Sequence, residues 1–192
     1  MNEFSIVCRL LGTLFQREPK DPILSPIIKM IGDGKLSQLW PLEQDALFNT
    51  LKNSVNDLAI VDADYQSLFG GEAPAVSVYA HAYEAIKEGD IRQFLVSRGM
   101  PVTDNPTDSF GSLLLAASWL EDNAAEDEVL AQIQLFDEYL LPWAGTFLGK
   151  VESHATSGFY RTLAGITRGA LSALREELSD EESDKAEDTE AE

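Results

Sequence analysis

The apolar residues of this chain recur every three or four positions along most of its length. That interval is the spacing of one face of an α-helix, whereas a half-buried strand would show strict alternation. The pattern is clearest at the start of the chain, where we expect a deeply buried helix over residues 2–17. Its apolar face consists of Phe4, Val7, Cys8, Leu11, Leu14 and Phe15. The pattern therefore predicts an all-α protein.

Prolines and glycines divide the rest of this pattern into further helices. Pro41 stands at the start of one helix, Gly89 separates two helices, and Pro142 separates two more. The expected helical segments span 2–17, 23–31, 42–60, 64–69, 76–88, 90–98, 108–122, 127–141, 143–155 and 157–178. Because 64–69 is only a short turn, we expect an irregular single-domain bundle of about nine helices.

A loop from Gly99 to Thr107 interrupts the helical pattern in the middle of the chain. Several helix-breaking residues follow one another here, among them Pro101 and Pro106. Asn105 is biased toward an extended backbone by the proline after it. We expect a central hinge-like loop, with Asp108 as the N-cap of the helix that follows.

The last fourteen residues, 179–192, differ in composition from the rest of the chain. Eight of them are Asp or Glu, one is Lys, and none is a large apolar residue. Such a segment cannot bury enough apolar surface to offset the entropy lost on ordering. The sequence therefore predicts a helical domain over 1–178 and a disordered acidic tail over 179–192.

The charge of the chain limits which partners it can attract. Thirty-three acidic residues against fourteen basic ones give a net charge of −19, and the part before the tail still carries −12. Such a field repels the phosphates of nucleic acids and anionic membrane surfaces. It would attract a basic peptide, although acidity also simply keeps a protein in solution.

The sequence also predicts a cytoplasmic protein. Cys8 has no second cysteine to pair with, which fits a reducing compartment, and its place on the apolar stripe predicts a buried structural thiol. The N-terminus lacks the basic and apolar segments of a signal peptide. The longest apolar run, 113–120, is much shorter than the roughly 20 residues that a membrane-spanning helix needs.

A search for catalytic or metal-binding groups finds no motif with the required spacing. His81 and His154 lie far apart, and no second cysteine or H-E-x-x-H pattern accompanies them. We therefore expect no metal and no cofactor. The acidic residues Asp62, Asp64 and Glu72 leave open an enzyme with a carboxylate site, which is the less favoured alternative.

Four stretches between residues 64 and 160 resemble, in order, the TorD/DmsD/NarJ family of helical maturation chaperones. The first is 64–69, similar to Tyr-x-x-Leu-Phe, and the second is 94–99, an aromatic residue followed by glycine. The third is 105–111, similar to Glu-Pro-x-Asp-His with Ser109 where His is common. The fourth is 136–143, similar to Phe-x-x-His-Leu-x-x-Trp with Tyr139 at the usual His, and Phe159-Tyr160 follows. The first ten residues and 111–122 resemble the YcdY-type branch.

This resemblance implies an all-α chaperone that binds a client enzyme, or its twin-arginine leader, before cofactor insertion and export. It also implies a monomer–dimer equilibrium through helix exchange. The YcdY-type branch is associated instead with a cytosolic metal-dependent phosphatase as client. A regulatory binding module that works through its acidic tail is the alternative from another class.

The central loop is the expected partner-binding region. A twin-arginine leader needs carboxylates for its guanidinium groups and an apolar surface beside them. Acidic residues of the loop and nearby aromatic rings can supply both, whereas Tyr65, Phe69, Trp119 and Trp143 are expected in the core. The candidate partner-binding residues are Tyr79, Tyr83, Asp104, Asn105, Pro106, Asp108, Ser109 and Phe110.

Overall fold

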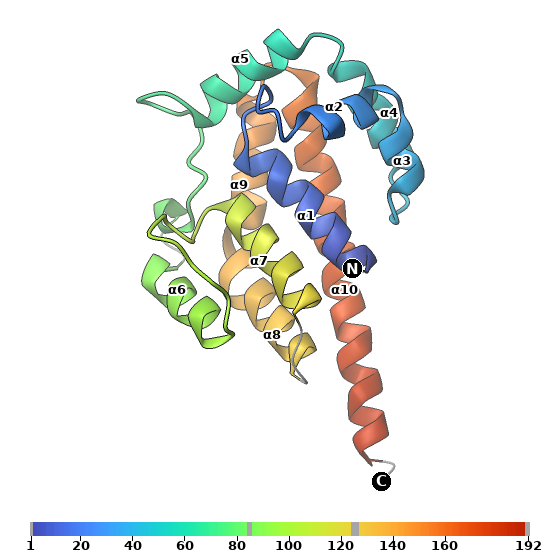
Figure 1. Ribbon diagram of the computed structural model, residues 1–192, viewed down its shortest axis with the longest axis vertical. Helices are drawn as coiled ribbons and strands as arrows, with labels where there is room; N and C mark the ends of the chain where they lie inside the picture. The colour runs from blue at the N-terminus through green and yellow to red at the C-terminus, as the bar shows by residue number, and fades with distance from the viewer. Residues whose placement is uncertain (1, 84–85, 124–126, 191–192) are drawn as a thin grey trace.

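Helices make up nearly all of the regular structure in the computed structural model (Figure 1). The structure describes residues 2–83, 86–123 and 127–190. Within these ranges the β-pairing consists of an isolated bridge between Tyr79 and Ser109. The prediction of an all-α fold is therefore confirmed.

The first helix, α1 (Glu3–Gln16), packs along α7 (Phe110–Asp122). The predicted stripe on α1 is confirmed, because all six of its residues are buried. Two glycines allow the backbones to approach closely. A Cβ atom on Gly12 would lie 2.9 Å from the Gly111 carbonyl oxygen, and one on Gly111 would lie 2.8 Å from the Gly12 oxygen. No larger residue fits at either position without a shift of the helices.

The next four helices are α2 (Ser25–Gly32), α3 (Lys35–Leu39), α4 (Asp45–Ser54) and α5 (Leu58–Phe69). Gly34, with φ at 71°, makes the turn into α3. The predicted helix over 42–60 and the short turn over 64–69 were wrong in their boundaries. The helix is interrupted before Asp57. The Asp57 side chain caps α5 by accepting hydrogen bonds from the backbone N–H groups of Ala59 and Ile60.

The predicted helix over 76–88 was also wrong, and residues 84–85 lie outside the described residues. The segment is extended as far as the 3₁₀-helix η1 (Ala80–Tyr83). Its backbone pairs with the start of α7. The Ala80 N–H donates to the Asp108 carbonyl at 2.9 Å, and the Phe110 N–H donates to the Val78 carbonyl at 2.8 Å. These long-range bonds replace the local ones that a helix would make. The following helix, α6 (Glu88–Ser97), lies close to its predicted place.

The chain continues through α8 (Glu128–Gln134), a π-helical segment η2 (Leu135–Leu140) and α9 (Leu141–His154). Pro142 lies in the first turn of α9, directly after the π-helical segment. Helix therefore continues where the sequence suggested a division. The π-helical segment was not predicted.

The last helix, α10 (Gly158–Glu190), packs against α9 and α4. Up to residue 183, where the described side chains of α10 end, Leu178 is the last buried one, and positions 180–183 are exposed. Figure 1 shows the C-terminal part of α10 extending beyond the other helices. The helix is thus longer than the predicted 157–178. The division into a folded domain and a disordered tail stays a prediction.

Candidate partner-binding site

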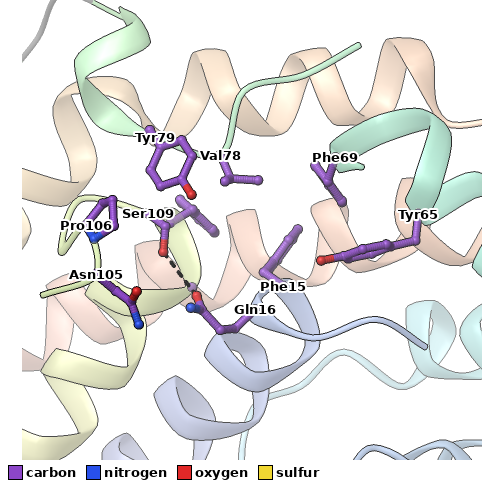
Figure 2. Close-up of a pocket in the computed structure, with 11 residues that line it drawn as sticks. Phe15, Gln16, Tyr65, Phe69, Val78, Tyr79, Asn105, Pro106 and Ser109 are labelled. Carbon is purple, nitrogen blue, oxygen red and sulfur yellow. Dashed lines mark hydrogen bonds between the residues drawn. The ribbon is translucent and has the colours of Figure 1, made fainter. Parts of the chain in front are cut away.

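A pocket of about 310 Å³ opens where the end of α1 meets α5 and the start of α7 (Figure 2). That volume is at the lower end of the range for ligand pockets, about 300–1,000 Å³. Its walls come from segments that are far apart in the sequence. They consist of Phe15, Gln16, Tyr65, Phe69, Val78, Tyr79, Asn105, Pro106, Ser109, Phe110 and Gly111.

Aromatic rings form the apolar floor of this pocket. The Phe15 ring meets the edge of Phe110 at a centroid distance of 5.1 Å and that of Phe69 at 6.4 Å. Beneath them the fully buried Phe147 lies 4.4 Å from Phe110, centroid to centroid. Rings packed edge to face in this way hold one another in place, so the floor is preformed.

Polar groups surround this floor. The Gln16 side-chain oxygen accepts hydrogen bonds from the hydroxyls of Ser109 at 3.0 Å and Ser112 at 3.3 Å. In Figure 2 the rings of Tyr65 and Tyr79 enter from different sides of the pocket. Burial raises the pKa of Tyr65, and the charge of Glu18 and the nearby Tyr79 raise it further. The Tyr65 hydroxyl therefore stays protonated and can donate a hydrogen bond at neutral pH.

Asp108 directly precedes the pocket residue Ser109 and is shielded from solvent. Its side chain is fully buried, and its Oδ2 accepts a hydrogen bond from the His81 backbone N–H at 3.1 Å. The same oxygen lies 2.5 Å from Nδ1 of His81, whose side chain is 58% exposed. Asp108 thus ties η1 to the start of α7.

The prediction that Asp108 caps α7 was wrong. The N-cap is Ser109, whose hydroxyl accepts from the Ser112 backbone N–H at 3.2 Å. The helix begins one residue later than expected because the backbone of Asp108 is held in extended pairing with Ala80. Serine is as good a cap as aspartate, so the sequence alone did not separate the two.

Two residues of α6 hold the central loop against the pocket. Arg92 donates to the backbone carbonyls of Thr103 and Asn105, both at 2.8 Å. Glu88 accepts from the Thr107 N–H at 3.1 Å and from its hydroxyl at 3.0 Å, and it is paired with Arg92. The Arg92 hydrogen bond is the main cause that lowers the pKa of Glu88. The loop is therefore braced, although its sequence resembles a hinge.

The structure brings together five of the eight candidate partner-binding residues. Three others lie elsewhere: Asp104 is exposed on the loop, Asp108 is buried, and the Tyr83 ring packs 5.1 Å from Trp143. The Tyr83 hydroxyl donates to the Ser77 carbonyl, and burial raises its pKa to about 12. The five that line the pocket are Tyr79, Asn105, Pro106, Ser109 and Phe110.

Sequence reasoning missed the contribution of α1 and α5. Tyr65 and Phe69 are half-buried and line the pocket, although both were expected in the core. Their place in the Tyr-x-x-Leu-Phe motif was the available signal. Gln16 gave no signal, because a polar residue at the end of a helix is ordinary. Trp143 does lie in the core, as predicted, and Trp119 is half-buried.

Outside this pocket the described residues show little reactive chemistry. No group of three or more potential metal ligands is found among them. Cys8 is buried as predicted, and burial raises the pKa of its thiol. The carboxylate of Asp64 is used in hydrogen bonds to the backbone and hydroxyls of Thr156 and Ser157. In the part of the chain that the structure describes, no helix has the length and apolar character to span a membrane.

The fold and the pocket together define an all-helical protein with a preformed pocket beside a braced loop. The family model described as nitrate reductase delta subunit matches residues 34–149, and the chain belongs to that family. This is the TorD/DmsD/NarJ family, as the motifs predicted.

Two proteins named as chaperones are among the relatives of this chain. The chain is 54% identical over 182 residues to "Chaperone protein YcdY" of Escherichia coli (strain K12), which covers 94% of this chain and 98% of the relative. It is 29% identical over 191 residues to "Tat proofreading chaperone DmsD" of Salmonella typhimurium (strain LT2), covering 92% and 91%. A protein of Haemophilus influenzae (strain Rd) without an assigned function is 38% identical over 187 residues, covering 94% of this chain and 97% of the relative. The resemblance to the YcdY-type branch is therefore confirmed.

Proposed function

We propose that this chain is a client-specific chaperone of the cytoplasm, which binds a cofactor- or metal-dependent enzyme and assists its maturation. Membership of the TorD/DmsD/NarJ family and relatives named as chaperones support this proposal. The single observation that carries it is the pocket at the end of α1, whose walls include residues of the first and third family motifs. A preformed pocket that combines an apolar floor with polar groups around it is a common form of binding site.

Two kinds of client fit the relatives. A relative named for Tat proofreading suggests a redox enzyme with a twin-arginine leader. The YcdY-type branch is instead associated with a cytosolic metal-dependent phosphatase, and the higher identity to that relative favours this second kind. A net charge of −19 would speed the encounter with a basic segment of either client.

The chain acts by binding in this proposal, and catalysis belongs to the client. The regulatory module with an acidic tail remains the alternative, and the exposed acidic positions after Leu178 are the observation that favours it. Dimerisation through helix exchange is a further part of the proposal. Light scattering of the full chain would detect the dimer.

The test compares client capture and client maturation. The full chain and a Tyr65→Ala variant are used as bait in extract from the source cells, and the retained proteins are identified. The native chain should retain one enzyme that contains a metal or cofactor. In cells that lack the chain, that enzyme should hold less of its metal or cofactor.

A matched control separates the pocket from general surface effects. Leu39→Ala removes a side chain that is 66% exposed on α3, away from the pocket. Leu39→Ala should keep the client and Tyr65→Ala should lose it. Unchanged loading of the enzyme in cells that lack the chain would refute the proposed function.

A further inference from the structure

The pocket lining carries no formal charge, although the chain as a whole is strongly acidic. None of the described residues that line it is Asp, Glu, Lys, Arg or His. The two carboxylates expected to meet a guanidinium group lie elsewhere, because Asp108 is sealed against His81 and Asp104 is not part of the wall. The sequence had suggested a site for arginines, whereas the geometry provides neutral groups.

Two side-chain amides offer unused hydrogen-bonding capacity to this pocket. The oxygen of Gln16 is occupied by Ser109 and Ser112, while no described residue accepts from its Nε2. The main chain of Asn105 is held by Arg92 and Thr103, and its side-chain amide has no partner among the described residues. A primary amide carries both donors and an acceptor, which is the complement of a peptide group.

The hydroxyls of Tyr65 and Tyr79 add two more neutral groups beside the aromatic floor. Neither hydroxyl has a hydrogen-bond partner among the described residues, and both tyrosines line the pocket. Figure 2 shows both rings and both amides around the same space. A polypeptide placed there could pack one apolar side chain on the aromatic floor while its backbone amides form hydrogen bonds with the surrounding polar side chains.

We propose that this pocket binds an extended, uncharged segment of polypeptide, through its main-chain amides and one large apolar side chain, and that it excludes an arginine pair. This inference rests on the proposed function, since the ligand is taken to be part of a client. A guanidinium group inside the pocket would lose its water without gaining a carboxylate, which is unfavourable. Basic residues that flank the segment remain outside, in the acidic field of the surface.

The experiment titrates the full chain with two blocked hexapeptides that differ only at their two central positions. One carries Phe-Leu there, the other carries Arg-Arg, and Ser and Gly fill the remaining positions. The neutral peptide should bind at least about tenfold more tightly to the native chain. Equal or tighter binding of the arginine peptide, or no binding of either, would overturn the inference.

A near-isosteric variant tests the role of the amide. Gln16→Glu keeps the acceptor for Ser109 but places a carboxylate in the pocket. It should weaken the neutral peptide about tenfold, the effect of one lost hydrogen bond, and should strengthen the arginine peptide. Gln38→Glu adds the same charge at an exposed position of α3 and should change neither. Equal affinities in the two variants would contradict the proposed role of Gln16.

Competition with the client separates this inference from the proposed function. The neutral peptide should displace the captured enzyme from the native chain. If the enzyme is captured and matured but the peptide does not displace it, the inference fails and the chaperone function stands. If no enzyme depends on the chain, the proposed function itself fails, whichever peptide binds.

Discussion

The carboxylate of Asp64 on α5 accepts hydrogen bonds from the backbone N–H of Ser157 at 2.9 Å and from its hydroxyl at 2.5 Å. Ser157 directly precedes α10. The other carboxylate oxygen accepts from the N–H and the hydroxyl of Thr156. Asp64 is only 1% exposed. It therefore acts as a capping group for α10 that comes from a distant helix, and it fixes the α5 wall of the pocket relative to the core.

Replacing Asp64 should destabilise the fold more than any surface carboxylate. Asp64→Ala leaves four donors without their acceptor, two of them on the buried Ser157, which should lower the free energy of unfolding by about 3 kcal/mol. Asp180→Ala, at an exposed position of α10, is the matched control and should change it little. Urea unfolding of the two variants measures the difference. Similar midpoints would show that the Asp64 contacts contribute nothing net.

The crossing of α1 and α7 should not tolerate a side chain. Gly12→Ala would place Cβ 2.9 Å from the Gly111 carbonyl oxygen, so the helices must separate, at a cost of roughly 1–3 kcal/mol. At Gly149 in α9 a Cβ meets nothing within 4 Å, and alanine there should stabilise the helix by roughly 0.5–1 kcal/mol. Thermal melts of the two variants should therefore shift in opposite directions. A shift in the same direction would argue against the tight crossing.

The role of Ser109 as the N-cap of α7 can be tested directly. Ser109→Ala removes the acceptor for the Ser112 N–H and should lower the free energy of unfolding by about 1 kcal/mol. The same substitution at Ser183, an exposed position of α10, serves as control and should have little effect. Urea titration measures both variants. No loss in Ser109→Ala would mean that another group caps the helix.

The brace between α6 and the central loop should weaken in acid. The pKa of Glu88 lies below its ordinary value of 4.5 in the folded chain, chiefly because Arg92 donates to it. Its contribution to stability is therefore complete above the unfolded-state pKa and is lost as the pH falls through the lower, folded-state pKa. The amide resonance of Thr107 should move over that acid range, and the movement should be absent in Glu88→Gln. A resonance that moves equally in both proteins would assign the change to another group.

The acidic end of the chain should be dispensable for folding. Leu178 is the last buried residue of α10 that the structure describes, and the sequence of 179–192 contains many charges but no large apolar residue. The free energy of unfolding should change by less than about 0.5 kcal/mol. The same truncated chain, used as bait, decides between the chaperone proposal and the tail-based module. Loss of the client on truncation would favour the module.

The sequence predicted the parts of the fold that depend on local periodicity. The buried face of α1 could be read directly, because Val7, Leu11 and Leu14 recur at helical spacing. The extended segment before η1 could not, because the backbone partners of Val78 and Ala80 lie about thirty positions away in the chain. Long-range pairing overrode the local helical pattern there.

The site was partly predictable for the same reason. Asn105, Pro106 and Ser109 lie in one short motif, so a local reading placed them together. Whether a carboxylate faces a pocket or the interior depends on tertiary contacts, and the burial of Asp108 against His81 left no trace in the spacing. The neutral lining of the pocket was not predictable from this motif, because it also depends on Gln16, which comes from the distant helix α1.

The π-helical turn at Leu135–Leu140 determines which side chains of α9 face the core. A π-turn holds one residue more than the α-helical turn it replaces, and one residue corresponds to about 100° of rotation around the axis. Trp143 and Phe147 face the core behind the pocket floor only with that extra residue in place. A single-residue deletion in this turn would swing both rings toward α9's outer side, and the pocket would lose its backing without any change in the residues that line it.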